Sequence, residues 1–516
     1  MLFNSFEFIF LFFPISVMGY FVLARYLSLE AALGYLVLAS LFFYAYWNPV
    51  YLLLILFSIA FNYVIGRVVT KDGVSGKRSV LVFGISVNLG LLAYFKYANF
   101  FVDNVNAVFG SDWNIGTIFL PLAISFFTFQ QISYLVDAWR GKTSEYNFLH
   151  YCLFVCFFPQ LIAGPIVHHS DILPQFMRRE NMSPRWSNFA IGLSIFAIGL
   201  FKKTVIADSL SQYVGPVYDD GGSVDFFRAW GSTLAYTFQL YFDFSGYSDM
   251  AIGAARVFGV KLPVNFFSPY KATSIVEFWR RWHMTLSRFL RDYLYIALGG
   301  NRHGNTRRYV NLFLTMLLGG LWHGAGWPFV IWGGLHGSYL MVNHGWRNLL
   351  GRLGLDFSAS MTYRAFAWLL TFIAVVFSWV YFRAPTLEEG NRIALAMLGF
   401  SGFELPGGIL ARLGVLAQYL QAQGVELSHG GGALLVQNYV WVLGAGLAAL
   451  ALPNVAQIFS RYDPVLYESE RIFQGERHHS LLSWDYNLRW AIVVAVAGVG
   501  GLLTLQQVSE FLYFQF

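Results

Sequence analysis

Charge is what this 516-residue chain has least of. Asp, Glu, Lys and Arg make up 12% of its residues, about half the share that a soluble domain carries. Hydrophobic residues make up 57%, so a soluble fold would lack the polar surface that keeps it dissolved. The shortage of charge excludes an ordinary soluble enzyme. The formal net charge of +6 then indicates the cytoplasmic loops of a membrane protein rather than a nucleic-acid-binding surface.

Cysteine is nearly absent, and the common motifs of soluble catalysis are missing. Cys152 and Cys156 are the only two cysteines, and their spacing of four places them on one helix face. We expect two buried apolar thiols, with a disulfide or a metal site as the alternative. The chain contains no His-Glu-x-x-His motif, no Gly-x4-Gly-Lys-Ser loop and no Gly-x-Ser-x-Gly elbow. We therefore predict no bound metal and no bound cofactor.

Long apolar blocks, by contrast, recur from one end of the chain to the other. A helix needs about 20 such residues to cross a hydrocarbon core about 30 Å thick. We predict an all-α polytopic membrane protein, a single domain over residues 1–516, with roughly 11 to 13 membrane helices. The first block, 8–26, has neither a basic n-region nor a small-residue cleavage site. We therefore expect it to be the first span and not a signal peptide.

The distribution of basic residues predicts the orientation of these helices. Residues 1–7 contain no Lys or Arg, and the turn 47–49 contains none either. The loop 67–78 contains four, and three arginines between residues 471 and 489 precede the last span. Because basic loops stay in the cytoplasm, we predict that the 67–78 loop lies inside and that both termini lie outside.

Two segments depart from the apolar pattern. Residues 384–432 form the least hydrophobic long stretch and contain Gly-rich turns, so we expect an extramembrane loop or excursion over 386–432. The chain ends in an aromatic tail, 507–516, with four aromatic residues among the last six. Such a tail either anchors at the membrane interface or folds back into the protein and presents the Tyr513 hydroxyl.

One histidine lies deep in an apolar block. His323 follows Asn311 by 12 residues, about 18 Å along a helix and so near the middle of a bilayer. An ionisable group at that depth is costly and is a functional candidate. The glycines on both sides leave room for a ligand or for a neighbouring backbone, and an imidazole can act as the general base of an acyl transfer. A buried histidine bonded to a neighbouring helix would show the same spacing.

The stretch 273–298 has the pattern of one amphipathic helix. Its apolar residues form a single stripe and its arginines lie off that stripe, as in a helix at the membrane surface. His283 falls between the two faces. Arg280 and Arg281 can bind the phosphates of a ligand or those of lipid headgroups, and the pattern leaves both open.

Four further positions near these histidines are candidates for lining a tunnel or binding a donor. Trp279 and Trp322 are close in sequence to the two histidines, and His336 follows His323 by 13 residues. Asp243 interrupts the apolar block 229–256, where a carboxylate must find a partner. We expect His336 and Asp243 to serve mainly as structural hydrogen-bonding groups.

Taken together, these motifs resemble one family. The chain is similar to the membrane-bound O-acyltransferases, in the branch that includes bacterial alginate O-acetyltransferases. The similar stretches follow the family's order over residues 1–385, whereas 386–485 matches nothing we can place. They are Phe95–Phe100, Pro159–Pro165, Tyr241–Met250, Glu277–His283, Leu290–Asn301 and Leu314–Gly324.

The resemblance implies a ring of helices around a central tunnel, with interfacial amphipathic helices, in the bacterial inner membrane. It implies that His323 is the catalytic histidine and that His283 occupies the second signature position. It also implies acetyl-CoA or another acyl thioester as donor, periplasmic acetyltransferase partner proteins, and an exported polysaccharide, alginate first, as acceptor. In a related teichoic acid D-alanylation system a partner protein ends in a similar aromatic tail, which makes Tyr513 a candidate acyl relay.

We therefore expect an O-acetyltransferase in which His323 deprotonates an attacking hydroxyl, such as that of Tyr513, while His283 positions the donor or stabilises charge. Two other classes stay open. A proton-coupled transporter would use both histidines and Asp243 as a proton path, although the chain shows no inverted repeat. A non-catalytic scaffold of a polysaccharide secretion complex would need none of these residues for its function.

Overall fold

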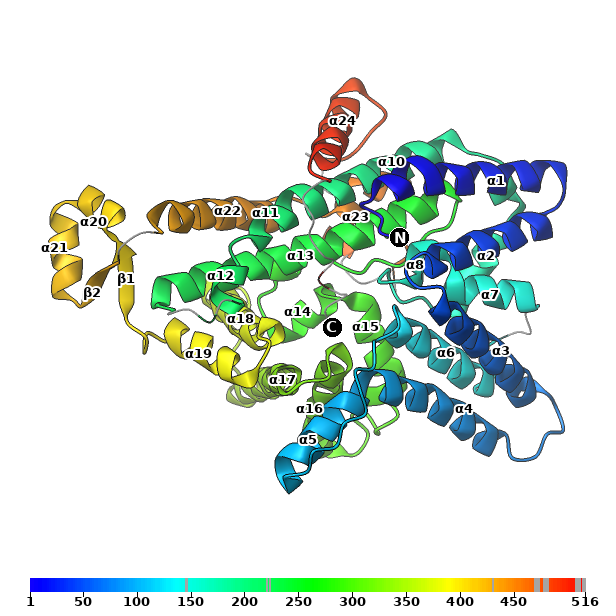
Figure 1. Cartoon of the computed structure of the whole chain (residues 1–516), viewed down its shortest axis with the longest axis horizontal. Coiled ribbons are helices and arrows are strands. Elements are labelled where there is room, and N and C mark those ends of the chain that lie inside the picture. Colours follow the sequence, from blue (N-terminus) through cyan, green and yellow to red (C-terminus); the bar gives the residue numbers. More distant parts are fainter. Residues whose placement is uncertain are drawn as a thin grey trace.

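The computed structural model describes residues 1–143, 147–219, 221, 224–428, 431–467, 474–476, 482–505 and 512. Within these residues the fold is helical, apart from one sheet of two short strands. Figure 1 shows the helices gathered around the long helix α13 (Phe226–Val257), with one small lobe projecting from the body.

The N-terminal part is a series of mostly apolar helices, coloured blue to cyan in Figure 1. Turns join most of them, and a longer connection runs over residues 110–123. Polar side chains mark where some of them begin: Ser28 accepts a hydrogen bond from the backbone N–H of Ala31, and Asn147 accepts one from that of His150. The helices are η1 (Glu7–Phe12), α1 (Phe13–Tyr26), α2 (Leu29–Ala45), α3 (Val50–Thr70), α4 (Lys77–Leu92), η2 (Ala93–Tyr97), α5 (Ala98–Phe109), α6 (Ile124–Trp139), α7 (Phe148–Cys156), α8 (Phe158–Leu161), α9 (His169–Phe176) and η3 (Arg179–Met182).

The middle of the chain forms the core around α13. Helix α10 packs against α13 through glycines, because a Cβ at Gly199 would lie 2.7 Å from the carbonyl oxygen of Gly246. Only glycine permits two helix backbones to approach this closely. Besides α13, the elements here are α10 (Trp186–Phe201), η4 (Lys202–Ala207), α11 (Asp208–Ser211), α12 (Gly215–Tyr218), η5 (Pro269–Lys271), α14 (Ile275–Arg281), α15 (Met284–Phe289), η6 (Leu290–Tyr295), α16 (Gly304–His323), α17 (Trp327–Leu353) and α18 (Met361–Arg383).

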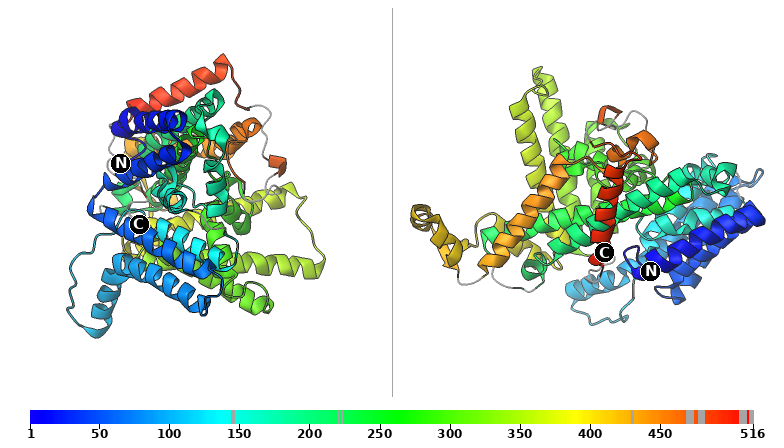
Figure 2. Two further views of the ribbon diagram at one scale, coloured as in Figure 1. Left: turned by 90° about the vertical axis from the view of Figure 1, so that its right-hand side faces the viewer. Right: turned by 90° about the horizontal axis from the view of Figure 1, so that it is seen from above.

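The C-terminal part includes the projecting lobe at the left of Figures 1 and 2 (right). In this lobe, strands β1 and β2 pair in parallel with Phe403 opposite Val425. The segment 386–432, which we predicted as a loop or excursion, thus contains secondary structure of its own. The elements are α19 (Leu387–Met397), β1 (Phe403–Pro406), α20 (Gly407–Leu413), α21 (Val415–Ala422), β2 (Val425–Ser428), α22 (Gly432–Ala451), α23 (Val455–Ile458), η7 (Ser460–Tyr462), η8 (Gln474–Glu476) and α24 (Leu488–Leu503).

Several of these helices can cross a membrane, which confirms the all-α polytopic class. Within the described part of the chain, six are long and apolar enough. Other apolar blocks are divided into shorter helices; the block 147–163, for example, becomes α7 and α8, where Cys152 and Cys156 are buried and free. The six are Glu7–Tyr26, Val50–Thr70, Lys77–Phe109, Trp186–Ser211, Met361–Arg383 and Gly432–Ala451.

Candidate active site

Helix α16 carries His323 into the interior of the protein. His323 is the last residue of α16, and 5% of its surface is exposed. Helix α17 packs closely on this end of α16. A Cβ at Gly333 would lie 2.5 Å from the carbonyl oxygen of Met316, and a Cβ at Gly320 would overlap the carbonyl oxygen of Phe329. Of the two alternatives that the glycines left open, a ligand or a neighbouring backbone, the structure shows the backbone at Gly320.

Aromatic rings surround the imidazole of His323. Its centroid lies 4.9 Å from that of Trp322, 5.2 Å from that of Trp332 and 5.1 Å from that of Phe382. The imidazole of His283 is the next ring, with its centroid 6.4 Å away. The structure thus brings together the two histidines that the sequence singled out, although 39 residues separate them in the chain.

His283 lies at a break in the chain rather than within a helix. Its φ of 41° is in the left-handed region, between the end of α14 and the start of α15. The prediction of one continuous amphipathic helix over 273–298 is therefore wrong. The cause is tertiary: the Asn265 carbonyl oxygen accepts the N–H of Met284 at 2.9 Å, and its side-chain oxygen accepts the hydroxyl of Thr285 at 3.0 Å.

Asn265 also determines which imidazole nitrogen of His283 carries the hydrogen. The side-chain oxygen of Asn265 lies 3.1 Å from Nδ1 of His283. Because the amide nitrogen of Asn265 donates to Ser248 at 3.3 Å, the oxygen is the acceptor and Nδ1 is the donor. His283 is fully buried, and the ring of Phe244 packs 4.8 Å from it. Backbone strain of this kind is concentrated at functional sites, and the fixed tautomer of His283 agrees with such a role.

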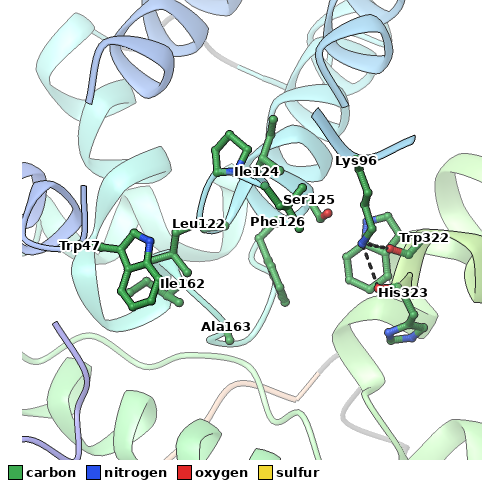
Figure 3. Close-up of a pocket in the computed structure, with 13 residues that line it drawn as sticks. Trp47, Lys96, Leu122, Ile124, Ser125, Phe126, Ile162, Ala163, Trp322 and His323 are labelled. Carbon is green, nitrogen blue, oxygen red and sulfur yellow. Dashed lines mark hydrogen bonds between the residues drawn. The ribbon is translucent and has the colours of Figure 1, made fainter. Parts of the chain in front are cut away.

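A small cavity of about 80 Å³ lies beside His323 (Figure 3). Besides His323, the polar residues Ser125 and Lys96 line it, and the ammonium of Lys96 donates to the carbonyl oxygens of Trp322 and His323. Our sequence interpretation missed Lys96 as a site residue, although a lysine close to an apolar block was an available signal. The lining consists of Trp47, Lys96, Leu120, Pro121, Leu122, Ala123, Ile124, Ser125, Phe126, Ile162, Ala163, Trp322 and His323.

A second cavity, of about 970 Å³, lies along α14, α15, η6, α16 and α17, and we call it the arginine cavity. Six arginines and two glutamates line it, together with apolar side chains that include Trp279 and Met316. Arg280 is exposed and makes no ion pair among the described residues. The six arginines are Arg280, Arg281, Arg288, Arg291, Arg308 and Arg347.

Arg281, by contrast, is held by two carboxylates. Its Nη2 atom lies 2.8 Å from Oε1 of Glu277 and 2.9 Å from Oε1 of Glu476. Burial opposes the ionisation of Glu277, but the N–H of Thr273, at 2.9 Å, and the Arg281 guanidinium outweigh it and lower the pKa of this carboxyl. Arg281 therefore ties α14 to η8, which is a structural role, while it also lines the arginine cavity.

Trp279 and His336 bond to each other near the two histidines. The indole N–H of Trp279 donates to Nδ1 of His336 at 3.2 Å, and the hydroxyl of Ser378 lies 2.9 Å from Nε2 of the same ring. Both ring nitrogens of His336 therefore have protein partners. His336 joins α14, α17 and α18, and Trp279 extends to the wall of the arginine cavity.

Asp243 belongs to a buried group of charges in the core. Lys203 lies between two carboxylates, 2.6 Å from Asp243 and 2.9 Å from Asp208, and all three side chains are buried. The backbone N–H of Leu512 donates to the other oxygen of Asp243 at 3.3 Å. Tyr513, the predicted acyl relay, lies outside the described residues, as does the rest of the predicted tail except Leu512.

Helix α16 connects the two cavities. Arg308 and Met316 line the arginine cavity, whereas His323 lines the small one. The 15 residues from Arg308 to His323 span about 22 Å of helix. An open recess lined by arginines and a small, mostly apolar pocket thus lie toward opposite ends of one helix, with both histidines at the inner end. This arrangement suits a reaction whose substrate has an anionic end and a reactive end some distance away.

Known proteins are similar to this sequence over most of its length. The model of the membrane-bound O-acyltransferase (MBOAT) family matches residues 140–384. A peptidoglycan O-acetyltransferase of Helicobacter pylori is 47% identical over 433 residues, which are 78% of this chain and 81% of that protein. A probable alginate O-acetylase AlgI of Pseudomonas aeruginosa is 43% identical over 415 residues, 78% of this chain and 76% of that protein.

A more distant relative extends the comparison beyond acetyl groups. The teichoic acid D-alanyltransferase of Streptococcus thermophilus is 28% identical over 237 residues, 44% of this chain and 57% of that protein. The resemblance found in the sequence is thereby confirmed, since the matches include the stretches with both histidines. The chain belongs to the membrane-bound O-acyltransferase family and is an acyltransferase.

Proposed function

We propose that this protein transfers an acetyl group from cytoplasmic acetyl-CoA, across the inner membrane, to an exported polysaccharide. The observation that carries the proposal is the course of α16, which runs from the arginine cavity to the small cavity that His323 lines, with His283 beside His323. A transporter would need no cavity lined by six arginines on the helix that carries the buried His323. A scaffold would need neither the strained backbone at His283 nor its fixed tautomer.

The arginine cavity suits a donor that carries phosphates. Guanidinium groups bind phosphate oxygens through paired hydrogen bonds, and here six arginines stand against two glutamates. Coenzyme A bears its phosphates at one end and its thioester at the end of a long uncharged arm. With the phosphates near Arg280, the arm would extend along α16 toward His323.

The positions of the basic loops support a cytoplasmic donor. Arg288 lines the arginine cavity and also a neighbouring cavity that Lys142 lines, and the next residue, Thr143, lines a third cavity together with Arg67. The arginine cavity therefore lies on the same face as the 67–78 loop, which we predict to be cytoplasmic. Both termini would then be periplasmic.

The opposite end of the site supports delivery to the outside. Trp47, in a turn that contains no basic residue and that we predict to be external, lines the small cavity beside His323. An acetyl group bound at His323 would therefore be closer to the periplasmic face than the phosphates of its donor. This arrangement agrees with the family's implied tunnel.

In the reaction that we propose, His323 removes the proton of an attacking hydroxyl. The hydroxyl oxygen forms a bond to the thioester carbon, the carbon–sulfur bond breaks, and the proton passes from the imidazolium to the leaving thiolate. His283 stabilises the charge that develops on the carbonyl oxygen or on sulfur. No cofactor is required, because the thioester supplies the energy of the transfer.

Tyr513 is our candidate for the first attacking hydroxyl. The support is its neighbour in the chain: the N–H of Leu512 bonds to Asp243 on α13, and the residue after Asp243, Phe244, packs on His283. The acetyl group would pass from Tyr513 to a periplasmic partner acetyltransferase and then to a sugar hydroxyl. Full acetylation of the polymer by a Tyr513→Phe variant would eliminate this relay.

The acceptor that we propose is an exported polysaccharide. Alginate was the prediction from the sequence, and relatives at 43% and 44% identity carry the name probable alginate O-acetylase. The relative at 47% identity is named for peptidoglycan, so the glycan strand of peptidoglycan is the second acceptor to assay.

The test is the acetate content of both polymers in cells that carry His323→Ala at normal protein levels. His303→Ala is the matched control, since His303 is an exposed residue at the other end of α16. Loss of acetate from one polymer in the first variant alone supports the proposal and identifies the acceptor. Unchanged acetate in His323→Ala would overturn the catalytic assignment and favour the scaffold.

A further inference from the structure

Helix α16 ends inside the protein, where its last carbonyl groups need partners. The final four carbonyls of an α-helix have no partner within the helix, and burying one without a partner is costly. The oxygen of Gly320 accepts the N–H of Gly324 at 3.4 Å. The oxygen of Leu321 accepts the hydroxyl of Tyr97 at 2.7 Å. Two carbonyls remain, those of Trp322 and His323.

One side chain satisfies both of them. The Nζ atom of Lys96 donates to the carbonyl oxygen of Trp322 at 2.6 Å and to that of His323 at 2.9 Å, as Figure 3 shows. The same ammonium lies 5.9 Å from the centroid of the Trp322 ring. A cation at a helix C-terminus is favourable because the helix dipole places partial negative charge there.

Capping alone does not require a charge. Tyr97, the next residue, satisfies the carbonyl of Leu321 with a neutral hydroxyl. A lysine within a membrane helix carries a desolvation cost that a neutral donor avoids. Lys96 also belongs to the π-helical turn η2, a rare conformation that is frequent at functional sites. The charge therefore needs an explanation beyond the two hydrogen bonds.

We propose that Lys96 is a positioning residue for acyl transfer, which holds the backbone at His323 and keeps a positive charge beside the small cavity. This inference rests on the proposed function. Lys96 lines the cavity that His323 lines and does not line the arginine cavity. Its charge therefore acts on the transfer step, whereas donor binding is left to the arginines.

Three substitutions of Lys96 separate the effect of its charge from the effect of its hydrogen bonds to the end of α16. Lys96→Met removes both. Lys96→Gln removes the charge but keeps two N–H donors on one side chain. Lys96→Arg keeps the charge and the donors. Lys71→Met is the control, because Lys71 is an exposed lysine in the 67–78 loop, away from the small cavity.

The measurement is steady-state transfer from radiolabelled acetyl-CoA in membranes that contain the full chain and its partner proteins. We expect Lys96→Met and Lys96→Gln to lower kcat about 100-fold, with the KM for acetyl-CoA within about twofold of wild type. Lys96→Arg should retain at least about one tenth of kcat, and Lys71→Met should match wild type.

Two results would overturn the inference. If Lys96→Gln keeps the wild-type kcat, the lysine is a cap and its charge is irrelevant. If KM rises in step with the fall in kcat, Lys96 binds the donor. Should Lys96→Met fail to accumulate in the membrane, the comparison of the Gln and Arg variants still decides. A wild-type chain that transfers no acetyl group would refute the proposed function instead, so the two failures are distinguishable.

Discussion

The two cavities at the ends of α16 differ in size, charge and construction. The arginine cavity is about 970 Å³ and takes its charge from six arginines on five helices. The small cavity is about 80 Å³ and has a few polar groups, of which Lys96 bonds to backbone carbonyls and His323 packs against neighbouring rings. Losing one of many similar charges weakens binding gradually, whereas displacing one fixed group removes a function. The large cavity should therefore tolerate substitution better than the small one.

The largest effect should come from separating α16 and α17. In Gly333→Val the new side chain would overlap the backbone at Met316, so His323 would move away from its aromatic neighbours. We expect kcat to fall about 1,000-fold, since misplacing a catalytic group by about 1 Å costs about two orders of magnitude by itself. Gly345→Val, on the same helix with open space around it, is the control and should be active. Equal loss in both variants would contradict the packing argument.

A smaller effect should follow when His283 loses its orientation. Asn265→Leu removes the side-chain oxygen that fixes Nδ1 of His283 and accepts from Thr285. We expect kcat to fall about 30-fold, within the range for a misoriented catalytic histidine, while KM for acetyl-CoA stays unchanged. Kinetics in membranes would measure this. A raised KM with normal kcat would mean that His283 contributes equally to binding in the ground state and in the transition state.

The arginine cavity should respond in KM and not in kcat. Arg280→Gln removes one exposed cation that has no ion-pair partner among the described residues. We expect KM for acetyl-CoA to rise about fivefold, about 1 kcal/mol, with kcat unchanged. The exposed Arg352→Gln, outside the cavity, is the matched control. A fall in kcat for Arg280→Gln alone would break the distinction between the two cavities.

The smallest effect should be structural. Ser378→Ala removes the hydroxyl that bonds to Nε2 of His336, the histidine shared by α14, α17 and α18. We expect the protein to lose about 1 kcal/mol of stability and to keep its kcat and KM. Thermal unfolding in detergent, beside an activity assay, would measure this. A large loss of activity with normal stability would place His336 in the reaction.

The sequence predicted the two histidines of the site better than the residues that hold them in place. Depth and family resemblance together identified His323 and His283, which the structure brings to adjacent positions. Resemblance alone could not show that Asn265 breaks the helix at His283, because a contact across 18 residues outweighs local amphipathic periodicity. The pattern also treated Arg280 and Arg281 alike, as partners of ligand or lipid phosphates, and could not show that two carboxylates contact Arg281.

Lys96 shows a second limit. It lies in a stretch that supported the family resemblance, yet its partners are main-chain carbonyls of residues 322 and 323, more than 220 positions away. No periodicity reports a hydrogen bond to a distant backbone. A lysine in an apolar surrounding was a signal for function in general, but only the fold shows which helix end it serves.

The aromatic rings around His323 have a consequence for the membrane itself. Rings whose centroids lie 4.9 to 5.2 Å from the imidazole pack in contact and leave no column of bulk water between them. Moving one elementary charge through a potential of 100 mV releases about 2.3 kcal/mol, so a hydrated passage here would drain the cell's proton gradient. In the transfer that we propose, the packing that orients His323 would also insulate the bilayer, because an uncharged acyl group would cross while ions are kept out.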